Sequence, residues 1–401
     1  MKIALLHYTT WPEIGGVENV LRDQAVMLHK AGHQVKVLSG SGIDSGEGYE
    51  FILMPELAPD FELNKTVSEV LTRGQSDQSF SQYRSVLVEA LRAALTGVDL
   101  TIVHNAFTTH FNLALTRALH DLAPEIRMVA WTHDLTATNS DFALPNPTQP
   151  PWNLMRTSAP GVAYVATSEV RAKEIKASLK PPVDADVIPN MVDPARLFVV
   201  TNEIRESLAS VELPKRDFVF FLPAKIMVRK NIDFAISVVA KLKEEGRNPL
   251  LFITGAKVAN SPASEHYGTF LRQSLPAALQ THVVFVNDFF EVQDDTMRDL
   301  YLLSDCLLFP SRQEGFGLPV LEAAHYRLPV WCQDIPSFRA IGGEGAYMLN
   351  DLAKLPDAVQ WLEARSTYRQ QRQCRRLFDP SNVYTQHYAN FLAALTLPVI
   401  A

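Results

Sequence analysis

Two glutamates in the segment 310–323, which reads PSRQEGFGLPVLEA, have the type and spacing to bind a hydroxylated ligand. Glu314 and Glu322 are separated by seven residues, and the glycines between them let the backbone approach a ligand closely. The apolar run from Leu318 predicts a helix, with Pro319 suited to its first turn. Glu322 then lies about one turn inside that helix, where a carboxylate can accept hydrogen bonds from a ribose diol or a sugar. The alternative is a solvated helix that carries two unrelated glutamates.

A second cluster of chemically useful residues is basic. The segment 223–231, PAKIMVRKN, follows the expected strand Phe218–Leu222 and contains Lys225, Arg229 and Lys230. A lysine ammonium acts on phosphate as a compact point charge, so this loop could neutralise a diphosphate leaving group without a metal. Three basic residues in a loop also fit plain solvent exposure, but a loop that follows a parallel strand lies at a ligand-binding edge.

The first half of the chain has weaker candidates, which again follow expected strands. Gly15 and Gly16 precede a helix that begins near Val17, and a helix N-terminus with glycine backbone favours an anion. A plain tight turn is the alternative for this pair. His133 follows another strand and could form a hydrogen bond with a substrate hydroxyl. It could equally be a structural histidine that caps a loop, and the sequence favours neither role. His104 is a weaker candidate of the same kind.

The elements that must position these residues alternate between short apolar runs and longer helical patterns, which predicts βαβ units and parallel sheets. The strands expected in the first half are Ile3–His7, Val35–Leu38, Phe51–Met54, Leu100–His104, Met128–Trp131 and Val162–Ala166. Those expected in the second half are Phe218–Leu222, Leu250–Thr254, Val283–Val286, Cys306–Phe309 and Pro329–Cys332. We therefore expect an α/β protein with two Rossmann-like domains facing across a cleft, because ligands bind outside the carboxyl ends of such strands.

The boundary between the two series is expected near residue 195. The segment 187–194, VIPNMVDP, is rich in proline and polar residues and predicts a turn-rich connection. The N-terminal domain is then 1–195 and the C-terminal domain 196–379. The last helical pattern, in 380–401, is expected to pack back on the first domain.

Composition is that of an ordinary globular protein. The chain has 401 residues, 47% hydrophobic and 20% charged, and its net charge of -7 gives no reason to expect nucleic acid. Cys306, Cys332 and Cys374 lie far apart and have no metal-ligand spacing, which fits a reducing compartment. No signal peptide or membrane-spanning run is found, so we expect a cytoplasmic protein.

Together these features resemble the family 4 glycosyltransferases, which have the GT-B architecture. The E-x7-E motif of that family is matched by Glu314 and Glu322. Lys225 and Lys230 match the basic pair of the family, in which the first residue is more often arginine. Gly15 and Gly16 match the N-terminal diglycine, and His133 matches the N-domain histidine. The segment Pro189–Asp193 resembles the family's linker PNGVD, with Met191 in place of glycine. Two departures are Arg327, where a glycine is frequent, and Ala340, where a glutamate is frequent.

The resemblance implies a retaining, metal-independent hexosyl transfer from a nucleoside-diphosphate sugar, UDP- or GDP-linked, to a hydroxyl. By this resemblance, Glu322 would bind the ribose, and Glu314 would contact the donor sugar together with the amides of Phe316, Gly317 and Leu318. Lys225, Lys230 and the Gly16 amide would stabilise the departing diphosphate. His133 would contact the donor sugar near the reacting carbon. Retention would follow from front-face attack, with the leaving phosphate taking the proton of the acceptor.

Alternative functions remain a non-catalytic nucleotide-sugar-binding protein, a sugar-nucleotide epimerase or a phosphorylase. The phosphorylase would need a lysine-bound pyridoxal cofactor, whereas we expect no cofactor. The acceptor, whether a sugar, a small molecule or a lipid-linked molecule, is expected to bind the first domain, at loops after residues 55 and 134. The basic segment 171–180 could contact a membrane, although a solvated helix face is favoured for it.

Overall fold

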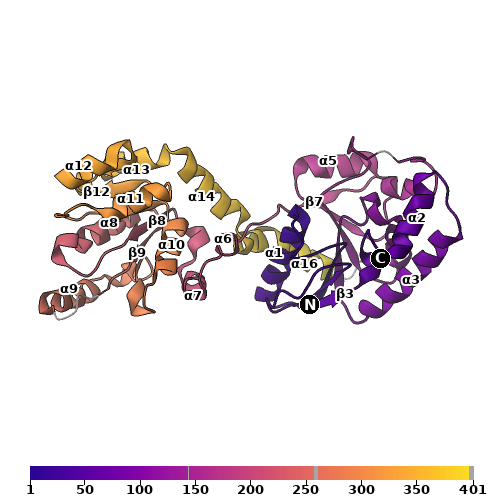
Figure 1. Cartoon of the computed structure of the whole chain (residues 1–401), viewed down its shortest axis with the longest axis horizontal. Coiled ribbons are helices and arrows are strands. Elements are labelled where there is room, and N and C mark those ends of the chain that lie inside the picture. Colours follow the sequence, from indigo (N-terminus) through magenta and orange to yellow (C-terminus); the bar gives the residue numbers. More distant parts are fainter. Residues whose placement is uncertain (143, 257–260, 397–401) are drawn as a thin grey trace. The chain divides into compact units, whose positions relative to one another are not determined.

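The computed structural model describes residues 1–142, 144–256 and 261–396, which form two compact units (Figure 1). The first unit is Met1–Val192 with the segment from Pro380 onward, and the second is Asp193–Asp379. The division falls after Val192, slightly before residue 195. Asp193 accounts for this position, because its Oδ1 accepts a hydrogen bond of 2.8 Å from the Ala195 amide and so starts the first helix of the second unit.

The first unit contains a seven-stranded parallel sheet with the order β3-β2-β1-β4-β5-β6-β7. Its strands are β1 (Lys2–His7), β2 (Gln34–Ser39), β3 (Glu50–Leu53), β4 (Leu100–His104), β5 (Met128–Thr132), β6 (Ala163–Ala166) and β7 (Ala185–Val187). The six expected strands are confirmed within one or two residues at their ends. β7 was not predicted, because it is a three-residue edge strand with an exposed aspartate and gives no apolar run.

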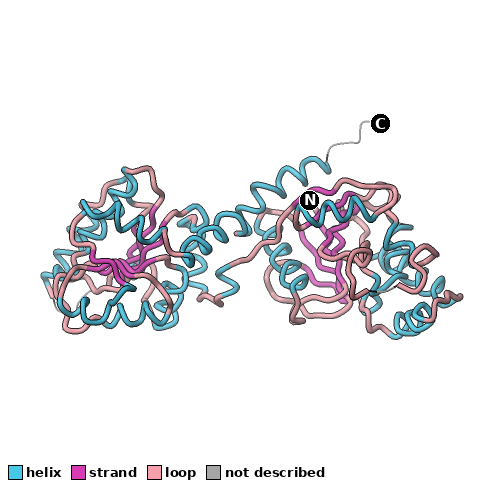
Figure 2. Tube along the Cα trace, turned by 90° about the horizontal axis from the view of Figure 1, so that it is seen from above, coloured by secondary structure: helices cyan, strands magenta, loops and turns pink. Residues whose placement is uncertain are grey.

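Helices cover both faces of this sheet (Figure 2). They are α1 (Gly16–Lys30), α2 (Glu62–Thr72), α3 (Gln78–Ala94), α4 (Leu113–Leu122) and α5 (Glu169–Ser178). The C-terminal segment adds α15 (Pro380–Val383), a π-helical turn (Tyr384–Tyr388) and α16 (Ala389–Thr396). Val383, Tyr388 and Leu392 are buried in the same core cluster as Leu21 of α1 and Ile102 of β4, so this segment forms part of the first unit's core.

The second unit contains a six-stranded parallel sheet with the order β10-β9-β8-β11-β12-β13. Its strands are β8 (Phe218–Leu222), β9 (Pro249–Ile253), β10 (Val283–Phe285), β11 (Cys306–Phe309), β12 (Val330–Cys332) and β13 (Ala346–Met348). Its helices are α6 (Pro194–Leu197), α7 (Asn202–Val211), α8 (Ile232–Glu244), α9 (Pro262–Gln273), α10 (Asp294–Leu303), α11 (Leu318–His325), α12 (Pro336–Gly342), α13 (Leu355–Glu363) and α14 (Ser366–Phe378). The five expected strands are confirmed, and β13 was missed because it is short and half-exposed.

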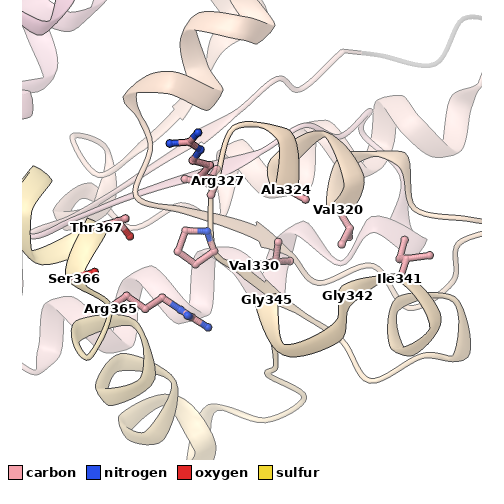
Figure 3. Close-up of a pocket in the computed structure, with 12 residues that line it drawn as sticks. Val320, Ala324, Arg327, Val330, Ile341, Gly342, Gly345, Arg365, Ser366 and Thr367 are labelled. Carbon is pink, nitrogen blue, oxygen red and sulfur yellow. The ribbon is translucent and has the colours of Figure 1, made fainter.

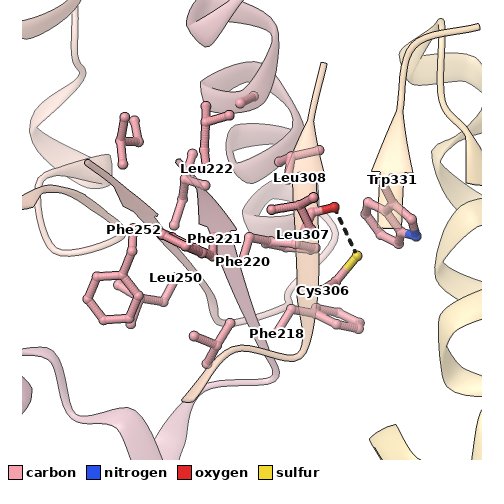
Figure 4. Packing of buried hydrophobic residues seen from close by; sticks show 14 of the residues in the cluster. Phe218, Phe220, Phe221, Leu222, Leu250, Phe252, Cys306, Leu307, Leu308 and Trp331 are labelled. Atoms are coloured by element: carbon pink, nitrogen blue, oxygen red, sulfur yellow. Dashed lines mark hydrogen bonds between the residues drawn. The ribbon is translucent and has the colours of Figure 1, made fainter. Parts of the chain in front are cut away.

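The central strands of the second unit are continuous apolar runs because both of their faces are buried. Phe218, Phe220 and Phe221 of β8 are fully buried and pack beside Leu307 of β11 and Trp331 of β12 (Figure 4). A buried side chain of this size stabilises the fold by roughly 1.5–3 kcal/mol. This core fixes the carboxyl ends of β8 and β11, from which the candidate loops emerge.

Each sheet has one point where the strand order reverses direction. In the first unit it lies between β1 and β4, and in the second between β8 and β11. Ligands of open α/β sheets bind at such switch points, outside the carboxyl ends of the strands. The loops that contain Gly15, Lys230 and Glu314 all follow these strands directly.

Candidate active site

Two loops of the second unit meet at its switch point, because β8 and β11 are parallel neighbours. The loop after β8 contains Arg229 and Lys230, and the loop after β11 contains Glu314. The Arg312 amide donates a hydrogen bond of 2.8 Å to the Arg229 carbonyl, and Arg229 Nη1 donates one of 2.9 Å to the Gln313 carbonyl. These backbone contacts hold the two predicted segments side by side.

Glu314 is the centre of this arrangement and is held by two cations. Its Oε1 pairs with Lys230 Nζ, and its Oε2 lies 3.3 Å from Arg229 Nη1. The side chains of Lys230 and Glu314 are only 12% and 11% exposed, so this pair is shielded from water. Burial raises the pKa of Glu314, but the hydrogen bond and charge of Lys230, together with contributions from Ser311 and Arg229, lower the net pKa. Glu314 is therefore ionised and can only accept hydrogen bonds.

Lys225, the other predicted lysine, lies in the same loop but is exposed. It makes no ion pair with another described residue, so its charge is available to an incoming anion. Lys230 differs, because its ammonium pairs with Glu314 and also lies 4.8 Å from the centre of the Phe309 ring. Within the part of the chain that the structure describes, no group of three or more His, Cys, Asp or Glu side chains has the arrangement of a metal site.

Glu322 lies on α11 and is exposed, but its carboxylate is held in one orientation. The Tyr301 hydroxyl, from α10, donates a hydrogen bond of 2.6 Å to Glu322 Oε2. The Tyr301 ring is buried and stacks on Tyr326 with ring centres 4.9 Å apart. Burial and then the Glu322 carboxylate raise the pKa of Tyr301, so the phenol stays protonated and remains a donor. Sequence reasoning missed Tyr301, because no spacing rule links it to Glu322.

Gly317 precedes α11 and sets the direction in which that helix begins. Its φ of +100° lies in the region that favours glycine, and a Cβ there would be 2.7 Å from the Phe338 ring. The side chains of its neighbours Phe316 and Leu318 are 54% and 60% exposed. The residues that flank the start of α11 are therefore exposed to solvent, and an anion or a hydroxyl oxygen is favoured at such a helix end.

We expect Gly317→Ala to destabilise the protein by about 1–3 kcal/mol, because the new Cβ meets both backbone strain and the buried Phe338 ring. Gly315→Ala is a matched control in the same loop, since a Cβ there has no atom within 4 Å and the backbone needs no positive φ. Denaturant unfolding of the two variants measures the difference. Equal stability of both variants would refute a conformational role for Gly317.

The diglycine of the first unit lies where the sequence predicts, at the start of α1. Gly15 is the extended N-cap residue, and a Cβ on Gly16 would have no atom within 4 Å, so the approach to Gly16 is open. Glu18 occupies one side of this helix end. It packs against Gly15, and its Oε1 accepts a hydrogen bond of 2.5 Å from the Thr9 hydroxyl.

His133 follows β5 and is half-buried at the same carboxyl edge of the sheet. Its backbone amide donates to Asn105 Oδ1 at 2.9 Å, and its Nε2 is 3.0 Å from His104 Nδ1. Burial lowers the pKa of His133 to about 3, helped by the charges of His7 and Arg171. The His133 imidazole is therefore neutral at physiological pH and interacts with a ligand as a dipole, not as a cation.

The buried imidazoles predict that the protein loses stability in acid. Burial puts the folded-state pKa of His104 well below 6.5 and that of His133 at about 3, whereas both titrate near 6.5 when unfolded. Below pH 6.5 the unfolded chain binds protons that the folded chain does not, so stability present above 6.5 is lost as pH falls. We expect these two histidines to contribute about 2 kcal/mol to the loss between pH 7 and 5.5 in urea unfolding. His7 and His120, whose pKa values burial also lowers, add to it. His104→Gln should reduce the total loss by about 1 kcal/mol, and an unchanged loss would refute the assignment.

The second unit also has a pocket away from these loops (Figure 3). Its volume is about 470 Å³, and it lies at the amino end of β12 beside the start of α14, with Arg327, Val330 and Arg365 in its lining. Neither Glu314 nor Glu322 lines it, so it is separate from the predicted site. Arg327 has φ of +57°, which explains why glycine is frequent at this position in the family it resembles.

Residues 14–196 match the family described as "Glycosyltransferase Family 4", and residues 203–364 match the family described as "Glycosyl transferases group 1". These two matches account for most of the chain, with one falling on each unit. The chain therefore belongs to the family 4/group 1 glycosyltransferases of GT-B architecture.

Individual relatives cover the chain to different extents. The serotype-specific mannosyltransferase WbdA of Escherichia coli is 33% identical over 153 residues, which are 35% of this chain and 17% of WbdA. The match thus spans about a sixth of WbdA. Mannosylglucosylglycerate synthase of Thermotoga maritima is 26% identical over 365 residues, covering 82% of this chain and 80% of that protein. A crystal structure of a glycosyltransferase from Rickettsia africae aligns over 99% of this chain and 100% of its own, with 16% identity and a TM-score of 0.37.

Proposed function

We propose that this protein transfers a hexosyl unit, with retention of configuration, from a nucleoside-diphosphate sugar to a hydroxyl acceptor. The observation that carries the proposal is the cation pair around Glu314 at the switch point of the second unit, in the loop that leads into α11. Such a site combines positive charge for a diphosphate with an ionised acceptor for sugar hydroxyls. A solvated loop or a purely structural ion pair would not need positive charge and an ionised acceptor together at the carboxyl edge of the sheet.

Lys225 and Lys230 would neutralise the diphosphate as the glycosidic bond breaks. Charge that is already positioned where negative charge develops needs no reorganisation during the reaction, which is why such groups lower the barrier. Lys225 has no ion-pair partner among the described residues, while Lys230 pairs with Glu314 and would be shared with the phosphate. With two lysines in this role, the proposal needs no metal ion for leaving-group stabilisation.

The two glutamates have separate roles in this proposal. Glu322 would accept hydrogen bonds from the ribose hydroxyls, with its carboxylate oriented by Tyr301. Glu314 would accept one from a hydroxyl of the donor sugar, beside the backbone amides of Phe316, Gly317 and Leu318. In the first unit, Gly16 would contribute an amide and His133 a neutral imidazole, and Gly15 would leave the backbone accessible.

The reaction itself needs no protein nucleophile. The bond between the anomeric carbon and the leaving phosphate oxygen breaks, and the acceptor oxygen bonds to the same face of that carbon. The leaving phosphate takes the acceptor's proton, so charge and atoms balance without a further reactant. The protein contributes positioning and electrostatic stabilisation, which together can supply most of the rate enhancement.

Mannose is the first sugar to test, because the names of WbdA and of the Thermotoga maritima synthase both contain the word mannosyl. UDP and GDP remain the candidate carriers, and the acceptor candidates are a sugar, a small molecule or a lipid-linked molecule. Within the described residues, no helix has the length and apolarity to cross a bilayer.

A thermal-shift screen with UDP, GDP, ADP and their mannose and glucose conjugates tests the donor class. We expect one base to raise Tm, with the conjugate that is transferred stabilising further by mass action. Donor hydrolysis to free sugar would then establish activity without a known acceptor. Binding without any turnover would support the non-catalytic alternative, and absorbance of a bound pyridoxal group would support a phosphorylase.

Glu322→Ala is expected to raise the Kd for the donor about tenfold to a hundredfold, because two hydrogen bonds to a charged acceptor are lost. Isothermal titration with the stabilising nucleotide measures this change. Glu363→Ala, at the end of α13, is the control for a carboxylate removed elsewhere in the unit. Equal affinities of Glu322→Ala and the unmodified protein would contradict the ribose role.

A further inference from the structure

A chain of buried hydrogen bonds connects His133 with the C-terminal segment of the protein. His133 Nε2 is 3.0 Å from His104 Nδ1, and His104 Nε2 is 2.7 Å from Gln24 Oε1. The Gln24 amide then donates from Nε2 to the Tyr388 hydroxyl at 2.8 Å. His104, Gln24 and Tyr388 are each fully buried, so no water competes with these contacts. All four residues belong to the first unit.

The chemistry of the groups assigns every proton along this chain. An amide oxygen can only accept, so His104 must donate from Nε2 to Gln24 Oε1. A neutral imidazole carries one N–H, which leaves His104 Nδ1 as an acceptor. His133 must therefore donate from Nε2, and its Nδ1 is left with a lone pair. That Nδ1 makes no hydrogen bond with another described residue.

Tyr388 is fixed by more than its hydroxyl. It ends the π-helical turn between α15 and α16, and its ring stacks on Trp131 with centres 5.2 Å apart and planes 23° apart. Trp131 lies in β5, two residues before His133. Single π-helical turns inside helices occur frequently at functional sites, because the extra residue redirects a side chain. The C-terminal segment thus supports both the strand that carries His133 and the hydrogen bonds that orient it.

We propose that Tyr388, Gln24 and His104 are positioning residues that hold His133 in its Nε2–H tautomer, with the Nδ1 lone pair available to a substrate hydroxyl. This inference rests on the proposed glycosyl transfer for the identity of the substrate. It assigns a function to the far C-terminal segment, whose tyrosine is 364 residues from Gln24 along the chain. The imidazole acts as a hydrogen-bond acceptor for a hydroxyl near the reacting carbon, not as an acid.

The tautomer can be measured without any ligand. In full-length protein with ¹⁵N-labelled histidine, long-range correlations distinguish a protonated ring nitrogen from one with a lone pair. His133→Asn identifies the signals of His133 by their absence. We expect the unmodified protein to show a protonated Nε2 and an unprotonated Nδ1 at His133. A protonated Nδ1 would overturn the proposal, because it requires the Gln24 amide to face His104 with its nitrogen.

Variants of the chain test its effect on both tautomer and turnover. Tyr388→Phe keeps the ring stack but removes the acceptor of the Gln24 amide, and we expect kcat to fall about fivefold with a smaller change in donor KM. Gln24→Met removes both amide atoms, and we expect a mixture of His133 tautomers with kcat lower by about tenfold.

Tyr384→Phe is the matched control. Tyr384 lies on the same π-helical turn, but its hydroxyl is 3.0 Å from His33 Nε2, outside the chain that reaches His133. We expect unchanged His133 signals and unchanged kcat in this variant. Loss of kcat or of the tautomer in Tyr384→Phe equal to that in Tyr388→Phe would reduce Tyr388 to a structural role. Unchanged signals in Gln24→Met would refute the proposal.

The two proposals fail separately in these experiments. If no transferase or hydrolase activity is found, the ¹⁵N spectra still decide whether Gln24 and Tyr388 set the tautomer. If activity is found but the tautomer is indifferent to Gln24→Met, the glycosyl transfer stands and the positioning role is wrong. Melting curves of each variant identify those that lose kcat through unfolding.

Discussion

Lys230→Ala is expected to lower kcat for sugar transfer, or for donor hydrolysis, by about 10²- to 10³-fold. This is the usual effect of removing one preorganised group that stabilises the negative charge developing in the transition state. The Lys230 side chain is 12% exposed and pairs with Glu314, so its charge acts in a site shielded from water. Donor affinity should change less, because Lys225 and Arg229 remain in the same loop. Steady-state kinetics with the donor identified by thermal shift measures kcat and KM separately.

The same variant should also change the pH dependence. Lys230 provides the largest contribution that lowers the pKa of Glu314, against burial, which raises it. Without Lys230, the carboxylate keeps Arg229 at 3.3 Å but its pKa rises, so the acid limb of the rate profile moves to higher pH. Lys241→Ala is the control, because Lys241 lies on α8 and is 45% exposed. Undiminished kcat in Lys230→Ala would contradict the proposed site.

Much of the fold follows from the sequence because burial on both sheet faces leaves a clear pattern. Phe218–Leu222 and Cys306–Phe309 are short apolar runs, each preceded by an aspartate and followed by a proline, and both are strands with the expected ends. The strands that were missed, β7 and β13, are three residues long and partly exposed at sheet edges. β7 and β13 form by pairing with their neighbours β6 and β12. The local sequence of such a short edge strand does not encode this pairing.

The candidate loops could also be predicted, because they follow expected strands directly. The switch points depend on the strand order, which only the structure gives. What could not be predicted is which side chains orient the candidates. Tyr301 reaches Glu322 from another helix, and Gln24 reaches Tyr388 across 364 residues. Such contacts depend on the packing of helices against the sheet, and no local spacing specifies them. Met191 is similar, because its burial in the first unit's core explains a departure from glycine only once the core is known.

Arg375→Met is expected to destabilise the second unit by roughly 3–5 kcal/mol, the cost of leaving one charge of a buried pair without its partner. Arg375 Nη1 and Nη2 donate to the two carboxylate oxygens of Asp305 at 3.1 and 2.8 Å, and the side chains are 9% and 1% exposed. Asp305 Oδ2 also accepts from the Val219 amide at 2.8 Å. This pair fastens α14 to the amino ends of β8 and β11, opposite the predicted site.

A double-mutant cycle separates the pair from simple packing loss. Asp305→Asn keeps an acceptor for the Val219 amide but removes the charge, so in the double variant with Arg375→Met no ion is left unpaired. We therefore expect the double variant to be more stable than the sum of the single effects predicts, by 1 kcal/mol or more in urea unfolding, a coupling of about the usual size for residues in contact.

Lys215→Met is the matched control, because Lys215 pairs with Glu212 at the surface, where both side chains are about 60% exposed. Its stability should match that of the unmodified protein, since exposed pairs contribute little. Strict additivity in the Asp305–Arg375 cycle would mean that α14 is held by its other contacts, with the buried charges contributing nothing specific.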